Sequence, residues 1–219
     1  MENASKALMM AAGILITILV IGAAIFMYRQ ITAPEKEKVE ETRIAQIQEF
    51  NNPYLSYEKT KVHGSELLSL VNKMRDYNTK IDKIEKYDGY MPMENTIKVK
   101  TPGKYIFTST SYTIEKLSQE IEKAKTIQDN KNYGGEQKLD RLVGLIGEYS
   151  IVNGNISTRD KFDKEVKEKL GLDPTKITVL DIQKYAEYIE FKRKTFKHTK
   201  TEYDTNGNGR ITKMSFEER

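Results

Sequence analysis

The sequence contains no cysteine among its 219 residues. This absence excludes disulfide bonds, thiolate zinc sites, cysteine nucleophiles and a lipidated cysteine anchor. Histidine is almost as scarce, with only His63 and His198 present. Neither histidine belongs to a His-Glu-x-x-His pair, and there is no serine elbow of the Gly-x-Ser-x-Gly type. We therefore expect no catalytic residues and no enzyme.

The chain also lacks long runs of charge of one sign. Its formal net charge is +4, but Lys and Arg alternate closely with Asp and Glu along most of the sequence. A nucleic-acid footprint needs clustered positive charge, whereas alternating charges are typical of a solvated surface. The sequence thus predicts no nucleic-acid partner. Carboxylates such as Asp181, Glu187 and Glu190 stand at helical spacing beside Lys184, which indicates ordinary surface ion pairs.

Charge is absent altogether from residues 7–28. A helix of this length, at about 1.5 Å per residue, extends roughly 33 Å and is long enough to cross a hydrocarbon core of about 30 Å. The sequence therefore predicts a transmembrane helix over 7–28, after a polar leader over 1–6. A cleaved signal peptide is the alternative, but the apolar run continues through Tyr28, where a polar segment would be expected. An uncleaved signal-anchor is favoured, with membrane lipid as a partner of 7–28.

The remaining sequence predicts a juxtamembrane helical stalk over 29–53 and one soluble domain over 54–219. Basic residues after the apolar run nominally favour a cytoplasmic domain, but long domains cross membranes largely regardless of flanking charge. We expect a single-pass membrane protein with the bulk of its chain outside the cytoplasm. Small residues lie four apart within the run, at Ala7 and Ala11 and at Gly13 and Thr17, and this spacing favours close helix contacts. A homo-oligomer or another protein partner is consistent with this spacing.

The soluble domain is predicted to be α+β, with several helices and antiparallel β-hairpins. Apolar residues recur every three or four positions from Leu67 to Ile84, and again in four later segments. The period changes to two around Thr101-Pro102-Gly103, which predicts a hairpin over 95–111. Two Asn-Gly pairs between β-prone runs predict a second hairpin at the end of the chain.

The turn of that terminal hairpin is the strongest candidate site. Asp204, Asn206 and Asn208 match the first, third and fifth positions of a calcium-binding loop, and Gly209 matches the sixth. Short oxygen side chains at alternate positions can wrap a hard cation, and glycine permits the bend. The twelfth position should be glutamate but is Ser215. A plain hairpin turn is therefore the alternative to a calcium site, and we expect no other cofactor.

Three segments resemble a group of small bacterial membrane-anchored proteins of unassigned function. They are the opening Met1-Glu2-Asn3-Ala4-Ser5-Lys6-Ala7-Leu8, the stretch from Gly64 to Lys73, and Gly209-Arg210-Ile211. Some members of that group accompany pilus or secretion machinery, so the resemblance implies an envelope component. The architecture is also similar to that of type IV pilins, but the chain has no basic leader ending in glycine and no glutamate five residues into a processed helix.

The sequence as a whole favours a non-enzymatic, membrane-anchored protein of the cell envelope that makes protein–protein contacts, such as an accessory component of a pilus or secretion assembly. A ligand- or calcium-binding domain that uses the Asp204 turn is the first alternative. A hydrolytic enzyme is the second.

Overall fold

The computed structural model describes the backbone of residues 2–83, 91–149, 151–152, 155–205 and 209–219. It describes the side chains of residues 13–28, 40–82, 91–149, 155–205 and 209–219. The chain divides into two compact units, Met1–Phe50 and Asn51–Arg219.

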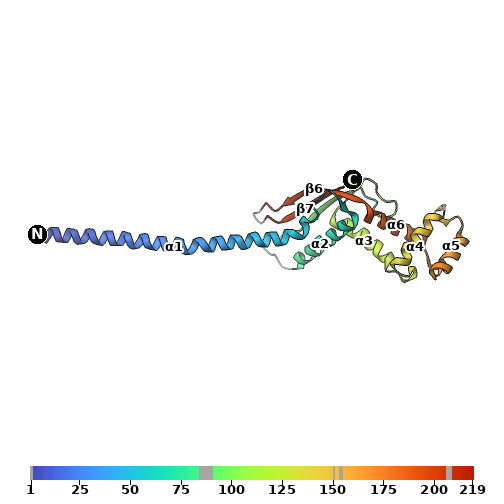
Figure 1. Cartoon of the computed structure of the whole chain (residues 1–219), viewed down its shortest axis with the longest axis horizontal. Coiled ribbons are helices and arrows are strands. Elements are labelled where there is room, and N and C mark those ends of the chain that lie inside the picture. The colour runs from blue at the N-terminus through green and yellow to red at the C-terminus, as the bar shows by residue number, and fades with distance from the viewer. Residues whose placement is uncertain (1, 84–90, 150, 153–154, 206–208) are drawn as a thin grey trace. The chain divides into compact units, whose positions relative to one another are not determined.

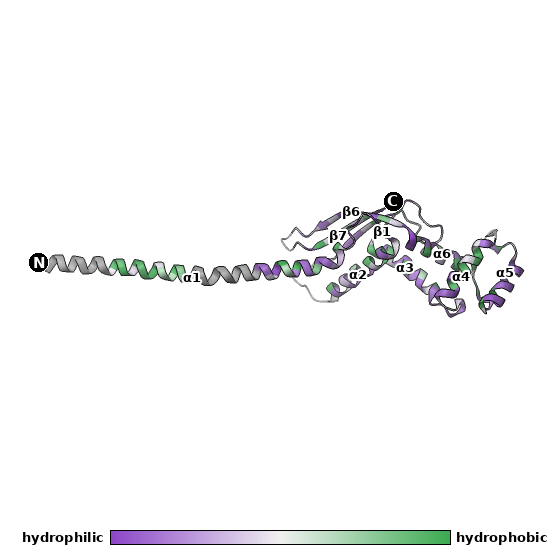
Figure 2. Ribbon diagram, in the orientation of Figure 1, coloured by the Kyte–Doolittle hydropathy of each residue, from purple (hydrophilic) through white to green (hydrophobic). Residues whose placement is uncertain are grey.

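A single long helix, α1 (Glu2–Leu55), makes up the first unit and supplies the first residues of the second (Figure 1). Its described backbone stays helical past Pro34. Among the residues of α1 whose side chains are described, residues 13–28 are the most hydrophobic, as the green stretch in Figure 2 shows. We call residues 13–28 the apolar segment.

The predicted transmembrane helix over 7–28 requires correction. Over the described residues, no helix combines the length and the apolar character needed to cross a membrane. On this finding the predicted transmembrane helix is wrong, and so are the single-pass membrane localisation and the extracytoplasmic placement based on it.

The second unit is α+β, as the sequence predicted for 54–219. It contains a five-stranded mixed sheet in the order β1-β6-β7-β2-β3. The strands are β1 (Val62–His63), β2 (Glu94–Lys98), β3 (Ser111–Tyr112), β6 (Thr195–Tyr203) and β7 (Ile211–Glu218). A separate small pair joins β4 (Ile151–Val152) to β5 (Asn155–Ile156). The central strand β7 pairs antiparallel with β6 and parallel with β2, so the sheet joins distant parts of the chain.

The helices of the second unit supply most of its core. They are α2 (Gly64–Lys83), α3 (Ile114–Gln128), α4 (Glu136–Glu148), α5 (Arg159–Glu165) and α6 (Val179–Arg193). Short 3-10 turns span Lys131–Tyr133 and Pro174–Lys176, and a π-helical turn spans Val166–Leu170. Helices α2, α3 and α6 contact one another beside the sheet, and α4 packs on α6 (Figure 1). Apolar side chains such as Leu70, Leu117 and Ile182 are fully buried between these elements.

The terminal hairpin is confirmed, because β6 and β7 pair along their length. The predicted hairpin over 95–111 is confirmed only at its ends, where Ile97 pairs with Tyr112 and Lys98 pairs with Ser111. Tyr105, Phe107 and Ser109 lie in a loop instead of a strand. Phe107 has a φ of 53°, which is unusual for a residue other than glycine, and its ring stacks on Phe191 at 4.5 Å.

Candidate functional site

The predicted calcium turn is described only in part. Asp204 follows β6, is 9% exposed, and donates its backbone N–H to the Arg210 carbonyl at 2.8 Å. Gly209 has a φ of 60°, a left-handed conformation that suits both a hairpin turn and the sixth position of a calcium loop. Asn206 and Asn208 lie outside the described residues. The calcium site formed by Asp204, Asn206 and Asn208 therefore stays a prediction.

The end of this turn is held by a side chain from the last turns of α1. The Asn51 amide donates to the Gly209 carbonyl at 2.9 Å and accepts from the Ile211 N–H at 2.9 Å. Asn51 is only 6% exposed, so its amide takes the place that a neighbouring strand would have at this edge of β7. In the described part of the chain, no three histidine, aspartate or glutamate side chains gather as a metal-binding group.

Both histidines have local structural partners. The backbone N–H of His63 donates to the Glu66 carboxylate at 2.7 Å, at the beginning of α2. The ring of His198 lies 2.8 Å from the Thr201 hydroxyl and meets the Phe216 ring edge-on at 5.5 Å. The structure does not bring the two histidines together with the Asp204 turn.

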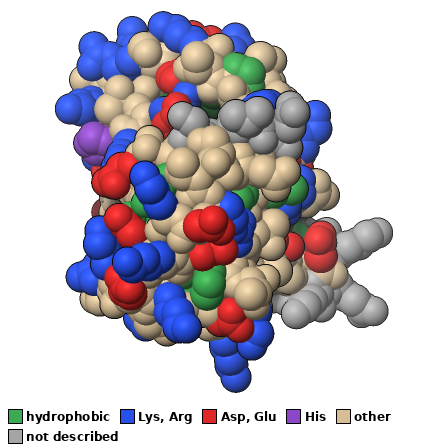
Figure 3. Space-filling model, turned by 90° about the vertical axis from the view of Figure 1, so that its right-hand side faces the viewer, with side chains coloured by type: hydrophobic (Ala, Val, Ile, Leu, Met, Phe, Trp, Pro, Cys, Tyr) green, Lys and Arg blue, Asp and Glu red, His purple; other side chains and the backbone are tan. Residues whose placement is uncertain are grey.

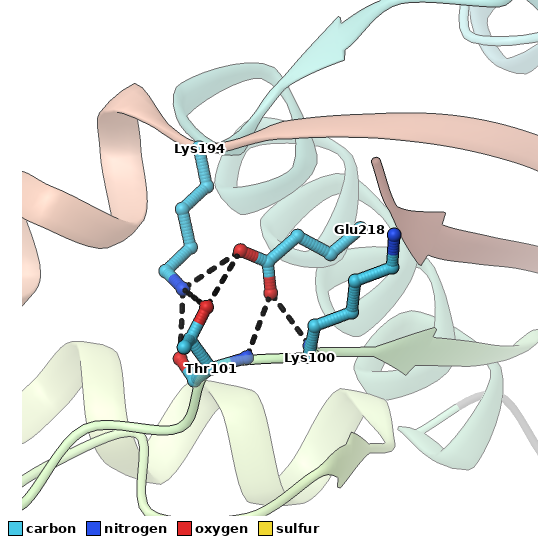
Figure 4. Close-up of polar contacts among 4 residues, drawn as sticks. All are labelled: Lys100, Thr101, Lys194 and Glu218. Atoms are coloured by element: carbon cyan, nitrogen blue, oxygen red, sulfur yellow. Dashed lines mark hydrogen bonds and ion pairs between the residues drawn. The ribbon is translucent and has the colours of Figure 1, made fainter.

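A polar cluster that the sequence did not reveal joins three distant segments (Figure 4). Glu218, at the end of β7, accepts backbone N–H groups from Lys100 at 2.6 Å and Thr101 at 3.2 Å. Lys194, directly after α6, forms an ion pair with Glu218 at 2.8 Å and donates to the Thr101 carbonyl at 2.7 Å. The two charged side chains are only 11–12% exposed. The cluster thus fixes the loop after β2 to both α6 and the sheet.

Electrostatics in this cluster favour the ionised carboxylate. Burial by itself would raise the pKa of Glu218, but the hydrogen bonds from Lys194, Thr101 and Lys100 outweigh burial and hold that pKa below its ordinary value. Glu218 and Lys194 are separated by 24 residues, so only the folded sheet brings them together.

A second carboxylate fixes the same loop. Glu187 of α6 accepts the backbone N–H groups of Lys104, Tyr105 and Ile106 at 2.7–3.1 Å. Three consecutive N–H groups that converge on one carboxylate form an anion nest. The sequence prediction of an ordinary surface ion pair for Glu187 is therefore wrong, although Asp181 does pair with Lys184 at 3.5 Å. The nest is occupied by the chain itself, so its role is structural.

A groove of about 710 Å³ lies between α4 and α6 in the second unit. Val143, Ala186 and Ile189 give it an apolar wall, and acidic and basic side chains stand beside them. Burial, together with the nearby charges of Asp140 and Glu136, raises the pKa of Tyr185 in this groove. Its phenol consequently stays protonated at neutral pH. The groove combines the apolar and polar groups of an ordinary contact surface.

The apolar segment presents the most unusual surface of the described chain. Ten large side chains within it are 53–66% exposed: Ile14, Leu15, Ile16, Ile18, Leu19, Val20, Ile21, Ile25, Phe26 and Met27. Soluble proteins rarely leave a contiguous apolar surface of this extent uncovered, and such patches mark interaction sites. We therefore take the apolar segment as the candidate functional site.

Comparison with known proteins gives no further guide, because no protein family, curated protein or solved structure matches the chain. On the face of the molecule drawn in Figure 3, the described Lys and Arg side chains are interspersed with Asp and Glu. This agrees with the charge pattern of the sequence. The absence of a nucleic-acid partner stays a prediction.

Proposed function

We propose that the chain is a non-enzymatic component of a protein assembly, of the kind formed by accessory proteins of pilus or secretion machinery. The observation that supports this function is the exposure of ten large apolar side chains on the apolar segment. A helix that is apolar on all sides is stable only when it is buried on all sides. Protein neighbours would provide that burial.

The resemblance of Met1–Leu8 and Gly64–Lys73 to small bacterial envelope proteins agrees with this proposal. The fixed loop after β2 agrees with it as well. Two carboxylates, Glu187 and Glu218, hold this loop in one conformation, which suits a scaffold more than a moving lid.

Photocrosslinking in the cells that produce the protein tests the proposal. A photoreactive amino acid at position 19, in place of Leu19, should yield adducts with protein, identified by mass spectrometry. The same amino acid at position 46, in place of the exposed Gln46 in the polar part of α1, is the matched control and should yield fewer adducts. Adducts with lipid alone, or no adduct at position 19, would contradict the proposed function.

A further inference from the structure

The apolar segment has no polar side along its most hydrophobic stretch. Successive residues of an α-helix are rotated by about 100°, so the seven exposed side chains between Ile14 and Ile21 point in every direction around the axis. The helix α3 differs, because its buried residues repeat every three or four positions and lie on one side. One neighbouring helix can cover one side of the apolar segment, but it leaves the opposite side in water.

The partner of this segment must be equally free of charge. A charged side chain placed against an apolar helix loses its hydration without gaining a counter-charge, which is costly. Residues 7–28, which include the apolar segment, form the longest stretch of the sequence without a charged residue. A second copy of the chain therefore offers a surface of matching chemistry and length.

The surface of the segment also permits close approach. Apart from the adjacent residues and the backbone of the helix itself, nothing lies within 4 Å of the position that a Cβ would occupy at Gly13 or Gly22. A shallow groove of about 410 Å³ lies beside Gly13 and Thr17. The Thr17 hydroxyl donates to the Gly13 carbonyl at 2.8 Å, so burial of Thr17 leaves no donor unpaired. Ten side chains that are more than half exposed offer on the order of 1,000 Å² of apolar surface, which exceeds the roughly 800 Å² per partner of a standard interface.

From these observations we infer that the apolar segment is covered by the apolar segments of other copies of this chain, in a bundle of more than two helices. This inference rests on the proposed function and names its partner. Each copy contributes the same apolar surface to this contact. More than two copies are required because one neighbouring helix covers only one side of a segment that has no polar side.

Disulfide crosslinking tests the inference cleanly because the chain has no cysteine. Ile14 and Ile16 lie about 200° apart around the helix, on nearly opposite sides. In the full chain, the double variant Ile14→Cys with Ile16→Cys should give covalent trimers and larger species on oxidation, whereas either single variant should stop at dimers. A double variant that also stops at dimers would overturn the inference of more than two copies.

Two further substitutions, each added to the Ile14→Cys and Ile16→Cys double variant, check that the series of crosslinked species depends on the apolar segment. Leu19→Glu should reduce species larger than a dimer at least tenfold, and Gln46→Glu, which adds the same charge to the polar part of α1, should leave them unchanged. Circular dichroism should show that both variants keep the folded second unit. Equal amounts of crosslinked species larger than a dimer from both variants would overturn the inference.

Failure of this inference is distinguishable from failure of the proposed function. A monomeric chain whose position 19 photocrosslinks to a different protein would overturn self-association and leave the assembly role intact. A monomeric chain that gives no protein adduct, and floats with phosphatidylcholine vesicles through its apolar segment, would overturn both.

Discussion

At the scale of single residues, Glu218 carries the most consequential polar contacts of the second unit. Its carboxylate accepts two backbone N–H groups and pairs with the ammonium of Lys194. Loss of its charge leaves a lysine that is 12% exposed without a counter-ion, and a nearly buried charge without a partner is expensive.

We expect Glu218→Gln to lower the free energy of unfolding by about 2–3 kcal/mol. Glu217→Gln is the matched control, because Glu217 also pairs with a lysine, Lys98 at 2.8 Å, but is 49% exposed. The control should cost less than about 1 kcal/mol. Urea denaturation of the full chain measures the free energy of unfolding of both variants. Equal losses of this free energy would show that burial of the Glu218–Lys194 pair does not set the cost of the substitution.

The pH dependence of stability follows from the same group. The pKa of Glu218 is lower in the folded chain than in the unfolded chain, where an ordinary glutamate has a pKa of about 4.3. A lowered pKa adds stability above the unfolded value, and this stability is lost as the pH falls through the folded pKa. The stability difference between the wild type and Glu218→Gln should therefore be full above about pH 5 and should shrink below about pH 4. A difference that stays constant from pH 7 to pH 3 would contradict the assignment.

The sequence could not reveal these residue roles. Glu187 stands at helical spacing beside Lys184, a pattern typical of surface ion pairs, yet its carboxylate accepts N–H groups from residues more than 80 positions earlier. The spacing of residues along a helix predicts which of them are neighbours on that helix. It does not predict contacts with a loop that packs against the helix.

At the scale of elements, the prediction from sequence succeeds where apolar residues repeat regularly over a long stretch of the chain. Helix α2 agrees with the periodic stretch predicted from Leu67, because it repeats apolar residues over several turns and must bury that side. The strand expected from Tyr105 to Ser109 was wrong, because carboxylates of α6 and α3 take the backbone N–H groups that a strand would use. The parallel pairing of β2 with β7 spans more than 100 residues, and no local signal encodes it.

Two glycines in helices test the packing of these elements. A Cβ at Gly64 would lie 1.9 Å from the Phe191 carbonyl oxygen, so Gly64→Ala must separate the beginning of α2 from α6 and should cost about 2 kcal/mol or more. A Cβ at Gly144 of α4 would meet nothing within 4 Å, so Gly144→Ala should stabilise the chain by about 0.5–1 kcal/mol. Thermal unfolding followed by circular dichroism should show shifts of opposite sign. A loss of stability in both variants would refute this account of α4.

The turn between β6 and β7 gives the calcium hypothesis its test. If Asp204 is a ligand, calorimetric titration of the full chain with calcium should release or absorb heat at up to millimolar concentrations, and Asp204→Ala should abolish it. No heat from the wild type at millimolar calcium would end the hypothesis. The left-handed Gly209 would then be explained by the hairpin turn alone.

At the scale of the whole molecule, apolar side chains are stabilised when they are removed from water. The positions of these side chains along the sequence decide whether the chain itself can bury them. In the second unit, apolar residues occupy one side of each element and find partners within the chain. In the apolar segment they occupy every side, and ten of them stay more than half exposed. Such a helix is therefore buried only by contact with other molecules. For this reason we propose that the protein belongs to an assembly.

The position of β7 also has a consequence for the synthesis of the protein. This strand follows every other strand of the sheet in the sequence, yet it lies at the centre of the sheet, between β6 and β2. A ribosome that has released residues up to 210 has supplied every other strand but not the one that joins them. We expect nascent chains arrested with β7 still in the exit tunnel to be digested readily by protease, and chains extended by a linker that frees Glu218 to resist it. The five-stranded sheet of the second unit is thus completed only after β7 has left the ribosome.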